Sequence, residues 1–395
     1  MLINKRWQGG LWISIICILL LMNILNYFEI FVSNIMLLMA QLAVMLVGAL
    51  IIALALPRVW RMPINKFFLT AALFFALSTI PFVLNTSKYA DIMVAAVNYS
   101  FWFVCLCVFM IIFSSSTEDD FKLLNNLLVF VFFVYSLMYI AVILTTDVET
   151  EVIGSINCVY YPLLLSPLVF LVEKPIVKIA ITTVSVLLVF VSGKRAAFIA
   201  LALALVIPFV FKAFKKSNRK RITYVILVIA VLALVLLLFD WLAQNYDIEI
   251  FDRLASTAED GGSGRTDIYG KVLEAIKENN IGELLLGNGF NTVFYDGVSG
   301  TSAHNDLLEI FYDYGLFALI AYFAFIITAI GVCISLYKKD NKCAESVLSA
   351  TLIFAVMTMV SHLVIYPTYF VFIIYFWVQG IRSSKNQQDE LTIKE

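Results

Sequence analysis

The sequence Thr301-Ser302-Ala303-His304-Asn305-Asp306 ends a polar segment that begins at Asp240, and an apolar stretch follows it directly. The segment 240–306 is the only extended part of the chain that is too polar to lie in lipid. It contains one of the two histidines of the protein. We therefore predict that 240–306 forms a loop outside the membrane that carries much of the chemistry, and that apolar helices form the platform beneath it.

The composition places the rest of the chain in a membrane. Of the 395 residues, 62% are hydrophobic and 14% are charged, and the mean hydropathy is +0.95. In a soluble domain, roughly a quarter of the residues are charged. The net charge of −1 gives no indication of a nucleic-acid partner, and the six cysteines show no paired spacing. We expect no nucleic acid, no disulfide framework, no metal site and no cofactor.

Apolar runs recur along almost the whole chain, and they predict an all-α polytopic protein with about twelve membrane-spanning helices. Three of the runs are short for a full crossing, so tilted, broken and re-entrant segments remain open for 159–172, 176–191 and 196–211. The full set is 11–28, 32–56, 67–84, 92–113, 121–144, 159–172, 176–191, 196–211, 222–239, 307–336, 346–365 and 368–381.

The spans and the loop divide the chain into four predicted parts. Residues 1–239 form an N-terminal bundle of about nine spans. Residues 240–306 form the extracytoplasmic loop, and 307–381 contain the C-terminal membrane helices. The polar residues 382–395 are predicted to form a disordered cytoplasmic tail.

The distribution of basic residues predicts the orientation. If the N-terminus lies inside, 20 of the 27 lysines and arginines fall in cytoplasmic segments. By the positive-inside rule, both termini are then cytoplasmic and the polar loop is outside. The basic residues left outside need a separate explanation, and they are Lys88, Lys194, Arg195, Arg253, Arg265, Lys271 and Lys277.

Local patterns predict the organisation of the polar loop. The sequence Gly261-Gly262-Ser263-Gly264 indicates a flexible break. A helix is predicted from Thr266 to Glu278, because its apolar residues share one face. The segment Gly282–Phe290 is predicted to be a turn-rich return toward the membrane.

His304 and Asn305 stand at the predicted start of the first helix after the loop. An imidazole at the membrane surface can accept a proton near neutral pH or donate to a phosphate oxygen. The alternative is that His304, Asn305 and Asp306 only cap the helix that begins near Leu307. The residues alone leave both interpretations open.

The sequence Ser192-Gly193-Lys194-Arg195 lies between two short apolar segments, on the predicted outer side. Glycine lets a backbone approach a ligand closely, and a guanidinium binds two phosphate oxygens at once, so this cluster suits a diphosphate. The alternative is a pair of cations that extend from helix ends toward water. Positive charge outside opposes the topology rule, and this favours the binding function.

Three further residues are candidates for the same site. Arg265 follows the glycine break and Arg253 precedes it, and each suits either an anion or an ion pair with local acids. His362 is predicted near the outer end of its span, where ionisable residues tend to be functional. A bond from His362 to a helix carbonyl is the alternative.

Several of these sequences resemble the O-antigen polymerase/ligase superfamily. Ser-Gly-Lys194-Arg195-Ala-Ala at the start of an apolar helix looks like the SGxR-type motif of that family. In the long loop, Gly-Ser-Gly-Arg265-Thr-Asp-Ile-Tyr269 and the later Leu-Leu-Gly-Asn-Gly-Phe290 are similar to the family's pattern.

The end of the loop carries a further motif of this family. His304-Asn305, nine residues and then Gly315 match the signature H-[NSQ]-x9-G-x-x-[GTY], except that Ala318 stands at the last position. The resemblance covers about residues 180–330 in its motifs, and the whole chain in its number of spans and placement of the loop. The departure at Ala318 weakens the assignment as a ligase more than the assignment to the superfamily.

The resemblance implies a GT-C-like integral membrane glycosyltransferase of the bacterial plasma (inner) membrane. Its substrates are undecaprenyl-diphosphate-linked oligosaccharides at the outer face, and its partners are membrane lipid and a chain-length regulator protein. A polymerase of O-antigen or capsule-type glycans transfers a growing chain to the non-reducing end of a new lipid-linked repeat unit. A ligase instead transfers the chain to lipid A-core. Both activities remain open.

The resemblance also implies roles for the candidate residues. Arg195 and Arg265 are expected to bind the departing diphosphate, and His304 to orient or deprotonate the attacking hydroxyl. The residues expected to bind substrate are Gly193, Lys194, Asn305, Arg253 and His362. Transfer is expected to invert the anomeric carbon without a metal ion. A lipid-linked-oligosaccharide flippase is the alternative of another class, and it predicts charged or broken helices at mid-membrane depth.

Overall fold

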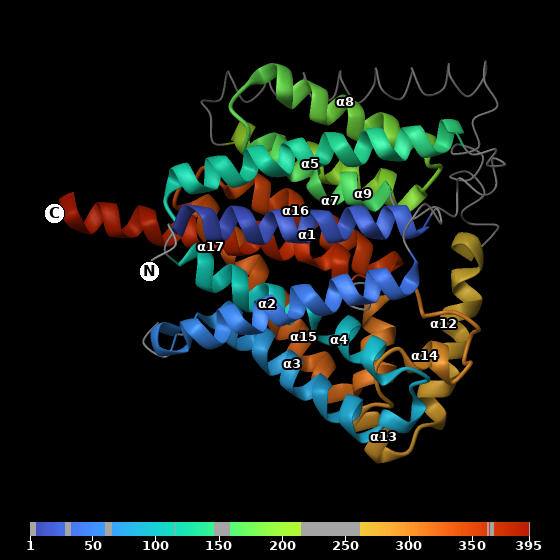
Figure 1. Ribbon diagram of the computed structural model, residues 1–395. Helices are drawn as coiled ribbons and strands as arrows, with labels where there is room; N and C mark the ends of the chain where they lie inside the picture. The colour runs from blue at the N-terminus through green and yellow to red at the C-terminus, as the bar shows by residue number, and fades with distance from the viewer. Residues whose placement is uncertain are drawn as a thin grey trace.

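The computed structural model describes residues 5–27, 33–59, 65–114, 116–145, 159–214, 261–361, 363 and 367–394. Within these ranges the regular structure is entirely helical and contains no strand, as predicted. The long helices run alongside one another in a bundle, and a group of shorter helices covers one end of it (Figure 1).

Six helices among the described residues are long and apolar enough to cross a membrane. They are α2 (Asn34–Val59), α3 (Lys66–Leu84), α4 (Ile92–Phe113), α5 (Glu118–Thr145), α9 (Arg195–Phe214) and α15 (Asp306–Lys338). Further apolar segments occur in α1 (Lys5–Tyr27), α7 (Tyr160–Leu165) with η3 (Ser166–Phe170), α8 (Pro175–Val191), α16 (Ala344–Val360) and α17 (Pro367–Lys394). This helix content is that of a multi-pass membrane protein. The predicted span 222–239 lies outside the described residues, so the count of twelve stays a prediction.

The three predicted spans that are short have three different structures. Residues 159–172 form a broken segment, in which α7 ends at Leu165 and η3 continues to Phe170. Pro167 explains the break, because proline has no amide hydrogen for the helix ladder. α8 has 17 residues. α9 has 20 residues, which is more than predicted and enough for a full crossing.

Buried aromatic rings fill the centre of the bundle, where α15 packs on α3 and α17 packs on α4. The ring of Trp377 lies 5.0 Å from that of Phe354, 5.6 Å from Phe325 and 5.9 Å from Phe370, measured between centroids. In lipid, the hydrophobic effect does not favour helix–helix contact over helix–lipid contact. The association of these helices therefore depends on close packing of this kind.

α9 and α16 also pack closely against each other. Small residues let two helix backbones approach closely in a membrane. The buried small residues of these two helices are Ala196, Ala197, Ala200 and Ala204 on α9, and Ala344, Ser346, Ser349 and Ala350 on α16.

The C-terminal helices differ from the predicted spans. α16 ends at Val360, before the predicted end at residue 365, and the capping residue Ser361 is extended. α17 continues to Lys394, so the prediction of a disordered tail is wrong over its described part. The side chain of Gln387 accounts for part of this order. It donates to the carbonyl of Lys339 (2.8 Å) and accepts from Asn341 Nδ2 (3.0 Å).

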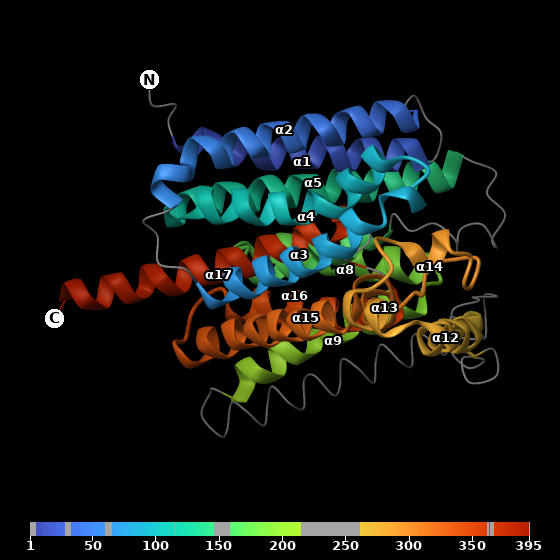
Figure 2. The same cartoon turned by 90° about the horizontal axis from the view of Figure 1, so that it is seen from below.

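The described part of the polar loop contains three helices: α12 (Gly261–Glu278), α13 (Ile281–Leu286) and α14 (Thr292–Tyr295). α12 begins before its predicted start, and the backbone departs from helical geometry at Gly264, whose φ is +75°. α13 stands where a turn-rich return was predicted. Its first turn is closed by a capping box between Asn280 and Glu283, which is a signal that the sequence did contain. α12 and α13 both pack against α15 (Figure 2).

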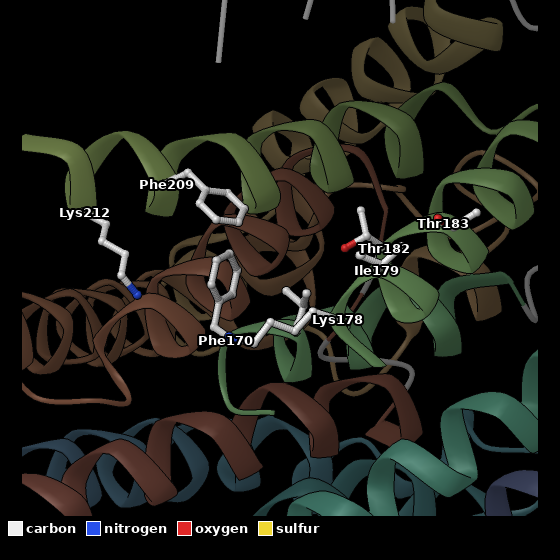
Figure 3. A pocket seen from close by; sticks show the side chains of 8 residues that line it. Phe170, Lys178, Ile179, Thr182, Thr183, Phe209 and Lys212 are labelled. Atoms are coloured by element: carbon white, nitrogen blue, oxygen red, sulfur yellow. The ribbon is translucent and has the colours of Figure 1, made fainter. Parts of the chain in front are cut away.

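The two ends of the bundle differ in the helices and charged side chains that lie there. The start of α1 and the end of α17 lie at the end opposite α12, α13 and α14 (Figure 1). Three ion pairs belong to this opposite end: Lys122–Glu173, Lys212–Glu345 and Lys342–Glu118, at 3.3, 3.5 and 2.6 Å. A pocket of about 290 Å³ between α8 and α9 also opens here (Figure 3).

The orientation in the membrane is open to a direct test. Tags near Ser217 and after Glu395 are expected to report the cytoplasm, and a tag near Ser299 is expected to report the outside. The reason is that the predicted topology puts 20 of the 27 basic residues on the side of the N-terminus. Labelling of intact cells with a membrane-impermeant reagent is the measurement. A Ser299 tag that reacts only after lysis would place the polar loop inside.

Candidate active site

Asn305 begins α15 and fixes the end of the polar loop. Its Oδ1 accepts from the amides of Leu307 (2.9 Å) and Leu308 (3.2 Å), and its Nδ2 donates to the carbonyl of Met359 on α16 (3.1 Å). These bonds satisfy amides that a helix start leaves without partners. The structure thus gives Asn305 the capping role, and the binding of substrate by its side chain stays a prediction.

His304 precedes the cap and has a left-handed backbone, with φ of +51°. This conformation is uncommon for residues other than glycine. The hydroxyl of Tyr269 on α12 lies 3.3 Å from the carbonyl oxygen of His304 and 3.2 Å from that of Met359. α12 and α16 therefore hold the backbone of His304 in place, and its half-buried side chain is not needed as the cap.

α15 is broken at Gly315, where φ is +74° and ψ is −178°. The sequence had predicted an unbroken span. The break frees the carbonyls of Tyr312 and Asp313 from the helix ladder. They accept instead from the amides of Asn288 (3.1 Å) and Gly289 (2.7 Å) in the segment after α13.

Two glycines allow these backbones to cross. A Cβ atom on Gly315 would lie 2.5 Å from the carbonyl oxygen of Leu285, and one on Gly287 would lie 2.3 Å from that of Asp313. Both glycines also have a positive φ, which other residues adopt only with strain. The sequence motif singled out Gly315, and the structure shows that it serves this crossing.

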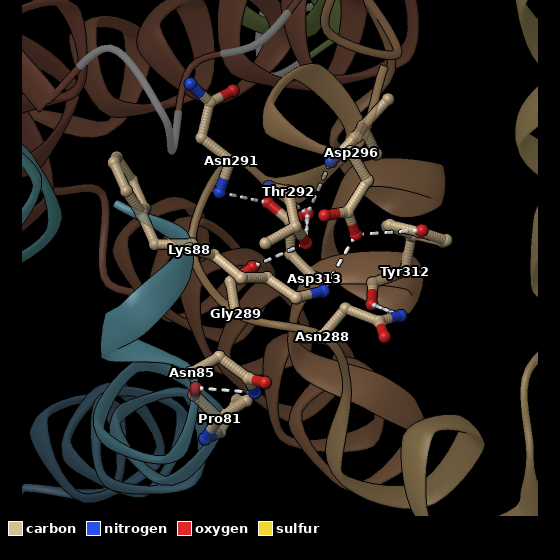
Figure 4. Close-up of polar contacts among 12 residues, drawn as sticks. Pro81, Asn85, Lys88, Asn288, Gly289, Asn291, Thr292, Asp296, Tyr312 and Asp313 are labelled. Carbon is tan, nitrogen blue, oxygen red and sulfur yellow. Dashed lines mark hydrogen bonds and ion pairs between the residues drawn. The ribbon is translucent and has the colours of Figure 1, made fainter. Parts of the chain in front are cut away.

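Asp313 holds the same segment through its side chain (Figure 4). Its fully buried carboxylate accepts from the amides of Asn291 (2.6 Å) and Thr292 (2.9 Å) and from Thr292 Oγ1 (2.8 Å). A buried carboxylate needs such donors, because it has lost its bonds to water. The segment from Gly287 to α14 is therefore fixed to α15.

The connection between α3 and α4 contacts this segment from the other side. Lys88 Nζ lies 2.8 Å from Asp296 Oδ2, which also accepts from the hydroxyl of Tyr312 (3.1 Å; Figure 4). The amide of Phe290 donates to the hydroxyl of Tyr89 (2.8 Å). Lys88 is one of the basic residues predicted outside, and its ion pair with Asp296 explains its place beside the polar loop.

The turn between α8 and α9 presents the second cluster of cations. Gly193 has φ of +62°, and its amide donates to the carbonyl of Phe190 (3.1 Å). A left-handed glycine is the usual end of a helix, so Gly193 has a structural role in closing α8. Lys194 follows, and Arg195 begins α9. Both side chains are half-buried.

Lys194, Arg265 and His304 come together in space from three separate parts of the chain. Burial, and then the positive charges of Arg265 and Lys194, lower the pKa of His304 below its ordinary value of 6.5. A lowered pKa keeps the imidazole neutral at neutral pH, and a neutral imidazole can accept a proton. The sequence predicted that these three residues share a site.

The predicted site roles of three residues, Arg195, Arg253 and His362, are not tested by the structure. Arg195 lies next to Lys194 in the chain, but the charges that lower the pKa of His304 are those of Arg265 and Lys194. The role of Arg195 therefore stays a prediction. Arg253 and His362 lie outside the described residues, and their predicted binding of substrate stays a prediction too.

Tyr160 is a member of the site that sequence reasoning missed. The ammonium of Lys194 lies 5.4 Å from the centre of its ring, a distance that allows a cation–π contact. Tyr160 is also within electrostatic reach of Arg265. The only signal in the sequence was the pair Tyr160-Tyr161 at the start of a segment too short for a full span.

Glu309 was missed as well. It is buried on α15, and one carboxylate oxygen accepts from the amide of Ala303, the residue before His304. Its other oxygen, Oε1, has no hydrogen-bond partner among the described residues. A carboxylate in the first turns of a predicted span was the available signal, since ionisable residues there are seldom without a role.

The arrangement combines three chemical capacities at one end of the bundle. Two cations can hold an anion, a neutral imidazole can accept a proton, and a backbone fixed by α12, α15 and α16 keeps them in place. Cations positioned in advance stabilise a negative charge that develops in a transition state. The site therefore suits the transfer of a group from an anionic leaving group to a hydroxyl.

The comparison with known families agrees with the resemblance seen in the sequence. Residues 180–323 match the family model described as O-antigen ligase. No curated protein matches the sequence significantly. The matched region contains Lys194, Arg265 and His304, and the family covers glycosyltransferase-like ligases and polymerases. In its motifs, and in this match over residues 180–323, the chain is similar to the O-antigen polymerase/ligase superfamily.

Proposed function

We propose that the protein is a polysaccharide repeat-unit polymerase of the GT-C-like type in the bacterial inner membrane. It transfers a glycan from undecaprenyl diphosphate to the non-reducing end of a lipid-linked repeat unit at the outer face. The observation that carries the proposal is the convergence of Lys194, Arg265 and a neutral His304 at the end of an apolar bundle. The apolar helices suit a lipid-linked substrate, and the cations suit its diphosphate.

The proposed reaction is a single displacement at the anomeric carbon. The hydroxyl of the acceptor sugar attacks this carbon, and the bond between carbon and the diphosphate oxygen breaks. The electron pair leaves with the diphosphate, whose charge is offset by Arg265, Lys194 and Arg195. The proton of the hydroxyl passes to His304. One displacement inverts the configuration, and the charge of the leaving group is balanced by side chains without a metal ion.

A ligase is the second candidate, because the matching family model is described as O-antigen ligase. The two activities share the donor and differ in the acceptor. A ligase accepts lipid A-core, whereas a polymerase accepts another lipid-linked repeat unit. Ala318, at the last position of the family signature, is buried in the bundle and does not favour the ligase.

The alternative of a flippase has less support. A transporter is expected to have charged or broken helices near the middle of its spans. The described residues do contain breaks, at Gly315 in α15 and between α7 and η3. In the six candidate spans among the described residues, the charged residues lie toward the helix ends. The cluster of Lys194, Arg265 and His304 lies at one end of the bundle, where a polar loop supplies the donors and acceptors.

Reconstitution of the purified protein tests the proposal. Liposomes that contain the protein and lipid-linked repeat units, without nucleotide or metal ion, are expected to yield polymer. A parallel reaction with lipid A-core as the only acceptor separates ligase from polymerase. Movement of labelled repeat units across the bilayer with no new glycosidic bond would support the flippase and contradict the proposal.

Arg195 provides a test of the diphosphate site. Arg195→Lys is expected to lower transfer at least about tenfold, because it keeps the charge but loses a paired hydrogen bond worth roughly 1.5–3 kcal/mol. Lys194→Ala is expected to cost less, since an ammonium forms no paired bonds. The measurement is polymer formed per amount of correctly inserted Arg195→Lys, Arg195→Ala and Lys194→Ala. Full activity of Arg195→Lys would mean that Arg195 only anchors the end of α9.

The pKa of His304 predicts the pH dependence of transfer. In the free protein the pKa lies below 6.5, so kcat/KM is expected to fall only in more acidic solution. Arg265→Gln removes a positive neighbour, which raises the pKa of His304 and moves this fall to higher pH. Lys271→Gln, an exposed lysine on the same helix, is the matched control. An unchanged profile in Arg265→Gln would contradict the role of His304 as the base.

A further inference from the structure

Two cavities lie together at the end of the bundle opposite His304. One, of about 290 Å³, lies between α8 and α9 and is lined by the rings of Phe170 and Phe209, whose centroids are 5.3 Å apart. The other has about 550 Å³ and a polar lining. Phe170, Lys178 and Lys212 line both cavities. In Figure 3, the two lysines extend from α8 and α9 toward the phenylalanine rings.

Four lysines and four acidic residues line the polar cavity, and the lysines differ in their partners. Three of the lysines that line the polar cavity have a glutamate partner: Lys122, Lys212 and Lys342. Lys178 is half-buried and has no ion pair among the described residues. A half-buried ammonium without a counter-ion favours the binding of an anion. The pair of Lys212 with Glu345 is long, at 3.5 Å, so Lys212 can add a bond to the same anion.

The polar cavity also contains a buried side-chain donor. Asn125 is 8% exposed, and its Oδ1 accepts from the hydroxyl of Tyr375 (2.7 Å) and from Gln379 Nε2 (3.4 Å). These bonds orient the amide of Asn125, and its nitrogen makes no hydrogen bond to the described residues. The cavity thus offers a half-buried ammonium that has no ion pair among the described residues, and a neutral donor.

The smaller pocket continues onto an apolar surface. On α8, Ile176 and Ile179 are 75% and 66% exposed, and Ile179 lines the pocket. In a membrane protein such side chains face acyl chains rather than water. A ligand that suits both cavities therefore has an anionic head in the polar cavity, near Lys178, and an apolar chain along Phe170, Phe209 and Ile179.

We propose that this pair of cavities binds one anionic phospholipid. Lys178 and Lys212 hold its phosphodiester, Asn125 donates to a head-group oxygen, and one acyl chain lies in the pocket between α8 and α9. A phosphodiester carries a single negative charge, which can pair with Lys178, the lysine of this lining that has no ion pair among the described residues. Basic pockets between membrane helices bind anionic head groups in this way. The proposal does not depend on the reaction at His304.

The test measures lipid binding and needs no glycan transfer. The full-length protein in detergent is titrated with phosphatidylglycerol, with phosphatidylcholine of the same acyl chains, and with glycerol phosphate, which lacks acyl chains. The thermal unfolding midpoint and the mass of retained lipid are recorded. Phosphatidylglycerol is expected to raise the midpoint and to remain bound as one molecule, and the other two are expected to do neither.

Two variants distinguish binding of phosphatidylglycerol at this site from a general attraction of anionic lipid to surface lysines. Lys178→Gln is expected to weaken the binding of phosphatidylglycerol at least about tenfold, the effect of losing one charge-assisted bond. Lys338→Gln is the matched control, because Lys338 is exposed and lines neither cavity. Equal retention of phosphatidylcholine, equal stabilisation by glycerol phosphate, or equal losses in the two variants would each overturn the proposal. The comparison of the three ligands on the wild-type protein holds even if a variant does not fold.

Discussion

Replacement of His304 by asparagine is expected to lower glycan transfer by about 10²–10⁴-fold, the usual contribution of a general base. The imidazole is kept neutral by burial and by the charges of Arg265 and Lys194, so it is ready to accept the proton of the attacking hydroxyl. The protein is expected to fold normally, because Asn305 supplies the cap of α15. The measurement is polymer formed per amount of folded protein.

The choice of asparagine separates the imidazole from the backbone. His304 has a positive φ, and asparagine tolerates this conformation better than alanine does. His304→Ala is also expected to lose transfer, but with added strain in the backbone. His362→Ala is expected to be milder. A rate close to that of the wild type in His304→Asn would leave His304 with a structural role only, and an equal loss in His362→Ala would mean that both histidines belong to the site.

Gly315→Ala is expected to cause the largest loss of stability of the single substitutions considered. The methyl group would lie 2.5 Å from the carbonyl oxygen of Leu285, a backbone atom that a side-chain rotation cannot remove. The positive φ adds strain. Together these effects amount to roughly 3 kcal/mol or more. The measurement is the thermal unfolding midpoint in detergent, together with the yield of inserted protein.

Gly331→Ala is the control for this substitution. Gly331 lies on the same helix, and a Cβ atom there would meet nothing within 4 Å. Alanine has a higher helix propensity than glycine, so a neutral or slightly stabilising effect is expected. Gly287→Ala is expected to resemble Gly315→Ala, because both glycines belong to one crossing. Equal stability of Gly315→Ala and Gly331→Ala would show that α15 can straighten without loss.

The sequence predicted most of the membrane helices because their signal is local. A run of apolar residues identifies a span without knowledge of its neighbours. The errors concern features that depend on distant partners. The break at Gly315 needs the backbone of Gly287 and Leu285, and the order of α17 beyond its apolar part involves the contacts of Gln387. α13 is different, since the capping box at Asn280 was present in the sequence.

The candidate site was predictable to the extent that its residues stand out chemically. Cations on a predicted outer surface and a histidine at a helix start are unusual. The resemblance placed Arg195, Arg265 and His304 in one site, and Lys194 was expected to bind substrate there. Tyr160 is an aromatic residue among many in an apolar chain. Only the folded arrangement brings its ring to the ammonium of Lys194.

The carbonyl of Met359 connects the surroundings of His304 to α16, and α16 extends to the proposed lipid site. It accepts from Asn305 and lies beside the hydroxyl of Tyr269, so the last turn of α16 sets the geometry around His304. The first turn of α16 carries Glu345, the partner of Lys212 in the proposed lipid site. If lipid binding favours a shift of α16 along its axis, that shift would move Glu345 and the carbonyl of Met359 together. Thermodynamic reciprocity then requires that substrate and lipid change each other's affinity by the same factor.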